Sequence, residues 1–270
     1  MPKAALIIGA GDATGGAIAR AFAAEGYVAC VNRRARNADQ LEALAASIRA
    51  QGHQARAFPG DARLEDEMIA MVDTIEAEVG PIEAAVFNIG ANVRFGIRET
   101  TAQVYRKVWE MAAFAGFLMG REAARVMVPR GQGTIIFTGA TASLRGGSGF
   151  SAFSGAKGAL RMLAQSMARE LGPQGIHVAH SIIDGGIDTE FIRNLRPDFD
   201  ALKALLAQFD EFLFVLALAI PDDRGQQIGA RPLFHRHDGI DHVLHLHRGD
   251  GQAGRRANRC IILSHGQRRK

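Results

Sequence analysis

A cluster of glycines near the N-terminus has the composition of a phosphate-binding turn. In the segment IIGAGDATGGAIA, Gly9, Gly11 and Gly15 fall, together with Thr14, between an apolar run and an amphipathic stretch. Because glycine has no Cβ, the backbone N–H groups that open the following helix can approach a phosphate closely. The segment therefore predicts a pyrophosphate cradle, although such turns also serve simply to join a strand to a helix.

Two arginines follow the next apolar run, at a position that distinguishes one nucleotide from another. The segment VNRRARN places Arg33 and Arg34 where an acidic residue would meet a free ribose 2′-hydroxyl. Guanidinium groups bind phosphate in a bidentate manner, so this pair favours NADP(H) over NAD(H). The alternative interpretation is a solvated basic turn.

These residues need a scaffold that alternates strands with helices, and the hydrophobic periodicity predicts one. Strands are expected at 3–10, 27–33, 54–61, 82–90, 133–140 and 177–184, and helices at 14–26, 38–52, 64–80, 101–130 and 155–175. Parallel strands need crossover connections, which helices of this length provide. We therefore expect an α/β protein with a doubly wound parallel sheet (Rossmann fold) in three layers, α/β/α.

Taken together, these motifs resemble those of the short-chain dehydrogenase/reductase family, over a range from about Ala4 to about Arg193. The glycine motif of the family maps onto Ile8 to Gly15, with Gly9 and Gly15 retained. The resemblance implies further cofactor contacts in later segments. These are Asp61 and Ala62 at the adenine ring, Asn88 and Gly90 in FNIG, Lys157 at the nicotinamide ribose, and Gly185 and Thr189 at the nicotinamide carboxamide.

The same resemblance indicates an altered catalytic set. The family uses an asparagine to hold a water relay, a serine to steady the substrate oxygen, a tyrosine to transfer the proton and a lysine to lower the pKa of that tyrosine. The matching positions here hold Ala112, Ala140, Phe153 and Lys157, so only the lysine is retained. A phenyl ring has no proton to donate, and a positioned general acid typically contributes about 10²- to 10⁴-fold to a rate. Neither of the two tyrosines of the chain lies in the segment before Lys157.

Catalysis would then need a replacement proton donor. Besides Lys157, a candidate is Asp184, which stands where the family usually has the proline before Gly185. Burial beside a nicotinamide would shift a carboxyl group toward its neutral form, which can act as an acid. Asp184 could instead cap the following turn through backbone amides. Nearby hydroxyl groups, which can also bond to local backbone, belong to Thr141, Ser143, Ser151 and Ser154.

The length and charge distribution suggest one domain followed by a segment of different character. With 270 residues, of which 47% are hydrophobic, the chain can bury one substantial core. We expect a single Rossmann domain over 1–206, in which the resemblance implies a lid at about 190–206, and a basic, His- and Arg-rich segment over 207–270. Residues 221–270 carry 10 basic against 5 acidic side chains, whereas residues 1–220 carry 22 against 23. A change of reading frame would produce such a break, a hypothesis that resequencing and intact mass would test.

Several classes of protein are disfavoured by composition. The longest apolar run, FLFVLALAI, has nine residues, short of the roughly 18 of a membrane span. The N-terminus leads into glycines rather than into a signal-peptide cleavage site, so we expect a cytoplasmic protein. Cys30 and Cys260 have no metal-site spacing, although a single bridge between them stays open. The basic segment lacks interleaved aromatic residues, so nucleic-acid binding is not expected.

Two hypotheses about function remain. The first is an NADP(H)-dependent oxidoreductase of a small-molecule substrate, with altered acid–base residues and a homo-oligomeric state (dimer or tetramer) if the C-terminal segment permits one. The second is a catalytically inactive cofactor-binding protein that acts as a sensor or oligomer partner. In either case the pocket would be lined by the loops 91–97 and 144–150 and by the lid, with Arg94 or Arg145 near its mouth, unless these arginines are merely solvated.

Overall fold

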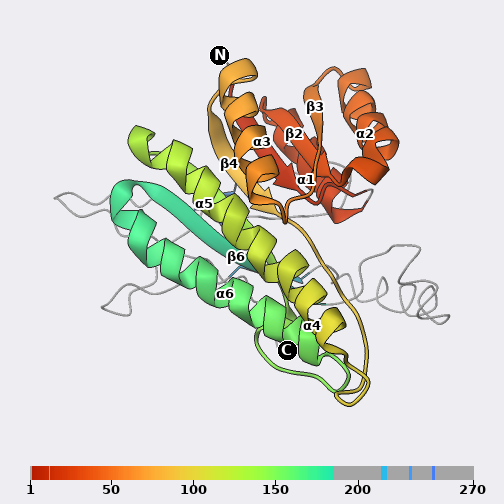
Figure 1. Ribbon diagram of the computed structural model, residues 1–270. Coiled ribbons are helices and arrows are strands. Elements are labelled where there is room, and N and C mark those ends of the chain that lie inside the picture. Colours follow the sequence, from red (N-terminus) through yellow and green to blue (C-terminus); the bar gives the residue numbers. More distant parts are fainter. Residues whose placement is uncertain (1, 12, 185–213, 218–230, 233–244, 247–270) are drawn as a thin grey trace, which may run out of the picture.

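Six parallel strands form the centre of the molecule, in the order β3-β2-β1-β4-β5-β6 (Figure 1). The structure, a computed structural model, describes residues 2–11, 13–184, 214–217, 231–232 and 245–246. The strands are β1 (Ala4–Ile8), β2 (Val28–Arg33), β3 (Gln54–Pro59), β4 (Ile82–Phe87), β5 (Gly133–Ala140) and β6 (Ile176–Asp184). A further strand, β7 (Phe214–Ala217), pairs antiparallel with β6, and β8 (Arg231–Pro232) pairs with β9 (His245–Leu246). The strand order reverses between β1 and β4, where open α/β sheets bind their ligands.

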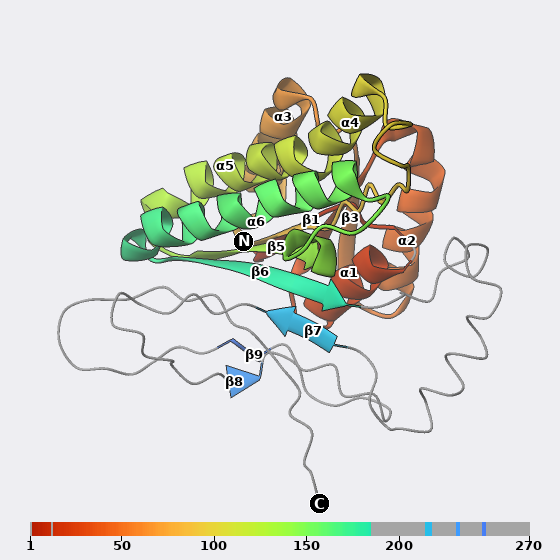
Figure 2. The ribbon, with the colours of Figure 1, turned by 90° about the horizontal axis from the view of Figure 1, so that it is seen from below.

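Helices cover both faces of this sheet. They are α1 (Thr14–Ala24), α2 (Ala38–Ala50), α3 (Glu65–Glu78), α4 (Ala102–Trp109), α5 (Ala115–Met127) and α6 (Ser151–Leu171). Figure 2 shows α3, α5 and α6 along one face, where they pack on Leu6 of β1, whereas α1 and α2 pack on Ile7 from the opposite face. Burial on both faces is typical of parallel strands, and the predicted three-layer α/β/α fold is confirmed. Among the described residues, no helix is both long and apolar enough to cross a membrane.

Two differences from the predicted helices bear on the site. Helix α6 begins at Ser151 rather than at Gly155, so its first turns include Phe153 as well as Lys157. Gly155 lies inside the helix where the Tyr105 side chain of α4 approaches it closely; a Cβ there would stand 2.8 Å from the Tyr105 hydroxyl oxygen. The helical stretch predicted over 101–130 is interrupted by a π-helical turn at Glu110–Phe114. Such turns often mark functional sites, and this one contains Ala112.

Candidate active site

The glycine-rich turn between β1 and α1 has two kinds of glycine. Gly9 has a φ of +83°, and a Cβ on it would stand 2.7 Å from the backbone oxygen of Asn88. A Cβ on Gly15 would stand 2.7 Å from the Cα of Ala10, so both glycines are required for the chain to cross itself closely. A Cβ on Gly11 would meet no heavy atom within 4 Å. The turn is thus packed tightly at two glycines and open at the third.

The helix that follows this turn has an N-terminus suited to an anion. Ala13 precedes Thr14 and offers no side-chain cap, and the first turn of α1 contains no acidic residue. The first N–H groups of a helix have no partner within the helix, and the positive end of the helix dipole favours a negative charge. Together with the open space at Gly11, these features fit the pyrophosphate of a dinucleotide.

Arginines gather where β2 and β3 end. Arg33 and Arg34 are half-buried, and Arg36 lies in the short 3₁₀ turn that follows. Burial lowers the pKa of Arg34, and the positive charges of Arg36, Arg63 and Arg33 add to this effect while Asp61 opposes it. Because a guanidinium stays charged at neutral pH, the group holds mutually repelling cations that a phosphate would relieve.

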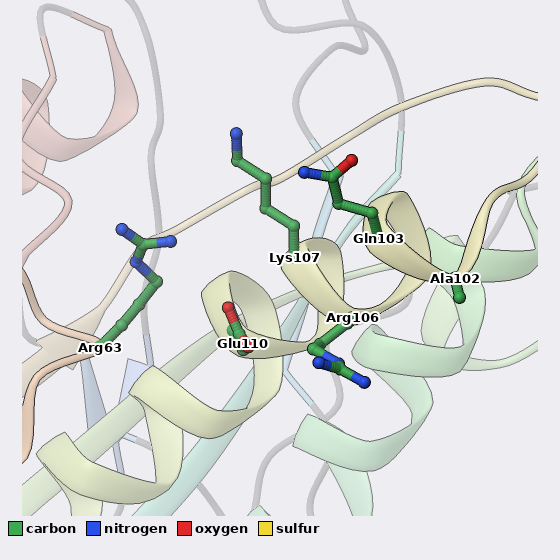
Figure 3. A pocket seen from close by; sticks show the side chains of 6 residues that line it. All are labelled: Arg63, Ala102, Gln103, Arg106, Lys107 and Glu110. Atoms are coloured by element: carbon green, nitrogen blue, oxygen red, sulfur yellow. The ribbon is translucent and has the colours of Figure 1, made fainter.

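Asp61, the predicted adenine contact, is held by a neighbouring arginine. The guanidinium of Arg63 donates from Nε to Asp61 Oδ1 at 2.9 Å and from Nη2 to Oδ2 at 2.5 Å, and these bonds lower the pKa of the carboxyl group. Ala62 beside it is buried. Arg63 also stands on one side of a hollow of about 420 Å³, and Glu110, Lys107 and Gln103 line its other side (Figure 3).

Asn88 connects three strands at the point where the sheet order reverses. Its backbone N–H donates to the oxygen of Ile8 at 2.8 Å, and its Nδ2 donates to the oxygen of Gly9 at 3.2 Å. Its Oδ1 lies 3.1 Å from the Thr138 hydroxyl of β5. The glycine turn is therefore fixed to β4 and β5 by a side chain that the sequence singled out, whereas Gly90, two residues further on, is exposed.

Lys157 is buried on α6 and reaches the carboxyl ends of two strands. Its Nζ donates to the backbone oxygens of Ile89 and Thr138, each at 2.9 Å, and the residue is 2% exposed. Burial lowers the pKa of Lys157 to about 7, a shift that the two carbonyl acceptors oppose. The ammonium and amine forms are therefore both accessible near neutral pH.

The other three positions of the predicted catalytic set bring no polar side-chain atom into this region. Ala112 is fully buried in an apolar cluster with Ala152 and Ala156 of α6. Ala140 ends β5 and is half-buried. Phe153 is 8% exposed and lies one helical turn before Lys157 on the same helix. The side chains at these three positions are therefore hydrocarbon, where the resemblance predicts hydrogen-bonding groups.

Comparisons with known proteins agree with this geometry. A family-wide profile described as short chain dehydrogenase matches residues 3–200. The chain belongs to the short-chain dehydrogenase family. The crystal structure of a short-chain dehydrogenase from Rhodopseudomonas palustris is 50% identical in sequence, with a TM-score of 0.65 over 78% of this chain and 92% of that one. The gluconate 5-dehydrogenase of Gluconobacter oxydans is 28% identical over 72% of this chain and 75% of its own, and the cis-4-hydroxycyclohexanecarboxylate dehydrogenase of Sinomonas cyclohexanicum is 28% identical over 84% and 93%.

Short-chain dehydrogenases are oxidoreductases that bind an NAD(P) cofactor and act on small molecules, so the residues of this chain can be compared with that role. The glycine turn, the uncapped α1, Asn88 and Lys157 lie around the switch point between β1 and β4, and the arginines lie at the end of β2. Gly185, Thr189 and the lid at 190–206 lie outside the described residues. Asp184 ends β6, but its side chain also lies outside the described part.

Several residues of this short-chain dehydrogenase site were missed by the sequence analysis. Thr138 accepts from Lys157 and contacts Asn88, and Asn32 ties the cofactor strands together by donating to the oxygens of Phe58 and Gly60. His180 of β6 is 1% exposed, and burial with the nearby charges of Lys157 and Arg161 lowers its pKa to about 3, so it is neutral. The available signal was a polar residue inside an otherwise apolar strand, as in the segments VNR, FTG and AHS.

Proposed function

We infer that this short-chain dehydrogenase uses NADP(H) in preference to NAD(H). The observation that carries this proposal is the group of four guanidiniums at the ends of β2 and β3, those of Arg33, Arg34, Arg36 and Arg63. Asp61 is the carboxylate among the charges that act on Arg34, and it is already bound by Arg63. This arginine group matches a ribose 2′-phosphate, and among the described residues it offers a free 2′-hydroxyl no acidic acceptor besides Asp61, which Arg63 already binds.

The reaction is the interconversion of an alcohol and a carbonyl compound. A cofactor held by the glycine turn and the arginines after β2 would accept the hydride of the alcohol, or supply one to the carbonyl compound. The hydroxyl proton must then leave the substrate oxygen. Of the four catalytic positions, the one at Lys157 retains an ionisable group. We assign Lys157 as the base: its Nζ, in the amine form, accepts this proton. The ammonium that results is held by the oxygens of Ile89 and Thr138.

We propose that the substrates include hydroxy acids. The names of two relatives, gluconate 5-dehydrogenase and cis-4-hydroxycyclohexanecarboxylate dehydrogenase, each denote a substrate that carries a hydroxyl and a carboxylate. The reaction proposed for this chain is therefore oxidation of a secondary hydroxyl in a small organic molecule, or the reverse reduction.

A second candidate function is cofactor binding without turnover, as a sensor or oligomer partner. It is favoured by the lack of a polar side chain at position 112, because Ala112 is fully buried in an apolar cluster with Ala152 and Ala156 and offers no side-chain atom to hold a water relay. Substrate-dependent oxidation of NADPH separates the two functions. Its absence across ketones and aldehydes, in a protein that binds NADPH, would select the second.

The test of cofactor preference is a fluorescence titration of the cofactor-free protein with NADPH and with NADH at constant ionic strength. NADPH is expected to bind at least about tenfold more tightly, because a charge-assisted hydrogen bond contributes 1.5–3 kcal/mol in typical cases, or roughly 10- to 150-fold. Arg33→Ala and Arg34→Ala should each weaken NADPH binding by about that factor and leave NADH binding nearly unchanged.

Arg56→Ala is the matched control for these variants. Arg56 lies on β3, is paired with Glu78 at 2.6 Å, and is absent from the charges that act on Arg34. Its removal should change neither affinity. Two results would overturn the proposed preference for NADP(H). One is equal affinity of the wild type for the two cofactors; the other is an unchanged affinity ratio in both Arg33→Ala and Arg34→Ala.

A further inference from the structure

The two loops expected to line the substrate pocket are joined to each other at a defined point. The backbone N–H of Phe95 donates to the oxygen of Gly149 at 2.9 Å. Gly149 has a φ of +84°, and a Cβ there would stand 3.0 Å from the Cγ of Arg94. Arg94 extends from this contact until its Cζ lies 5.8 Å from the centre of the Phe150 ring. The guanidinium is therefore positioned by a ring and by a close backbone approach.

Arg94 is an exposed arginine on the 91–97 loop. Some arginines of the scaffold are paired with acidic side chains, as in Arg49 with Glu42 and Arg130 with Glu76, whereas others, such as the exposed Arg98, have no such partner among the described residues. Within the described part of the chain, Arg94 has no ion pair and no side-chain hydrogen bond; its contact is the face of Phe150. The ring holds the cation in place without neutralising it, because a cation–π contact leaves the donors of the guanidinium free for an anion.

Helix geometry relates this cation to the reacting end of the site. Phe150 is the residue before α6, and Phe153 and Lys157 follow it at spacings of three and seven. Residues at i, i+3 and i+7 share one face of a helix. With a rise of about 1.5 Å per residue, Phe150 and Lys157 are separated by about 10 Å along the axis. The row therefore runs from the exposed loop that carries Arg94 to the buried residues Phe153 and Lys157.

We propose that the substrate is a hydroxy acid whose carboxylate is bound by Arg94 and whose hydroxyl lies several bonds away, beside Phe153 and Lys157. This inference rests on the oxidoreductase function proposed above and specifies its substrate class. The separation of about 10 Å between Phe150 and Lys157 along the helix axis favours a hydroxyl several bonds from the carboxylate over one on the adjacent carbon. Phe150 and Phe153 supply the apolar wall between the ends, which suits a hydrocarbon ring or chain.

The proposal is tested by calorimetric binding to the complex of the full chain with NADP⁺, followed by turnover. The probes are cis-4-hydroxycyclohexanecarboxylate, its neutral methyl ester and its cis-2-hydroxy isomer. The wild type is expected to bind the 4-hydroxy acid at least about tenfold more tightly than either of the others, because a hydrogen-bonded charge pair contributes roughly 10- to 150-fold. Arg94→Gln should remove this advantage, and Arg94→Lys should restore part of it.

Arg98→Gln provides the matched control, since Arg98 is an exposed arginine four residues further along the same loop and does not contact Phe150. It should behave as the wild type. A methyl ester that binds as well as the acid, no binding of either, or an Arg94→Gln variant indistinguishable from the wild type would each overturn the carboxylate site. Failure of the protein to bind NADP⁺ at all is a different result, which would overturn the cofactor assignment on which the proposal rests.

Discussion

The part of the site that would bind the nucleotide (the nucleotide half) and the part around Lys157 (the reaction half) differ in the groups that form them. The nucleotide half consists of close backbone approaches at Gly9 and Gly15 and of side chains, such as Asn88, bonded to backbone. The reaction half around Lys157 is lined at two of its three altered positions by buried apolar groups, Ala112 and Phe153. Backbone geometry cannot be exchanged one side chain at a time, whereas a polar side chain can be replaced by a packed apolar one without disturbing the fold. Binding and chemistry can therefore diverge separately.

The largest effect should come from adding a methyl group to the nucleotide half. Gly15→Ala places a Cβ 2.7 Å from the Cα of Ala10, so the turn must shift, which typically costs 1–3 kcal/mol in a packed region. We expect a lower melting temperature and loss of measurable NADPH binding.

Gly11→Ala is the control that separates packing from binding. Its Cβ meets no heavy atom, so the melting temperature should be retained. If that space holds the pyrophosphate, however, NADPH affinity should fall by about tenfold or more. A Gly11→Ala variant that binds NADPH normally would show that the pyrophosphate lies elsewhere.

A smaller effect should follow from returning a hydroxyl to the reaction half. Phe153→Tyr places a phenol on the helix face that carries Lys157, and a positioned general acid contributes about 10²- to 10⁴-fold. We expect ketone reduction to rise by about 100-fold in single-turnover measurements, and further when Ala140→Ser is added. Phe117→Tyr, on an exposed ring of α5, should have no effect. No gain in Phe153→Tyr would indicate that the reaction half no longer positions a substrate carbonyl.

The smallest effect concerns the charge of Lys157. The pKa of Lys157 in the folded protein is lowered to about 7, below the unfolded value of 10.5. Between pH 7 and pH 10.5 the unfolded chain therefore binds more protons than the folded one. Because of this difference, the folding stability rises with pH over that range. Relative to Lys157→Met, the wild type should gain up to about 1.4 kcal/mol per pH unit over this window.

Urea unfolding at pH 7 and pH 9 measures this slope for both proteins. His180 does not titrate in that range, because its pKa is lowered to about 3. A stability difference between wild type and Lys157→Met that is independent of pH would mean that Lys157 keeps an ordinary pKa and is a poor base at pH 7.

The fold was predictable because its signals are local and repeated. Each strand is an apolar run and each helix an amphipathic one, and their alternation permits little besides a parallel sheet with crossovers. The start of α6 was placed too late, at Gly155, which lies inside the helix beside a side chain distant in sequence, that of Tyr105 in α4. The π-helical turn at Glu110–Phe114 was not predictable, because it depends on how α4 and α5 pack on α6.

Site residues that belong to a sequence motif could be predicted, whereas those whose role depends on a contact formed by the fold could not. Gly9, Gly15, Asn88 and Lys157 were named from sequence, and the structure brings them together around the end of β1 and β4. The pairing of Asp61 with Arg63 was not foreseen, because two residues of opposite charge at this spacing give no periodic signal. The partnership of Arg94 with Phe150 joins residues far apart in the chain, which only the fold can show.

The way in which Lys157 is held has an evolutionary consequence. Both acceptors of its Nζ are main-chain oxygens, those of Ile89 and Thr138, and a main-chain oxygen survives any substitution of the residue that bears it. The anchoring of the lysine therefore does not depend on which side chains stand at positions 112, 140 and 153. Substitutions at those positions can change the chemistry of the site without releasing Lys157 from the fold.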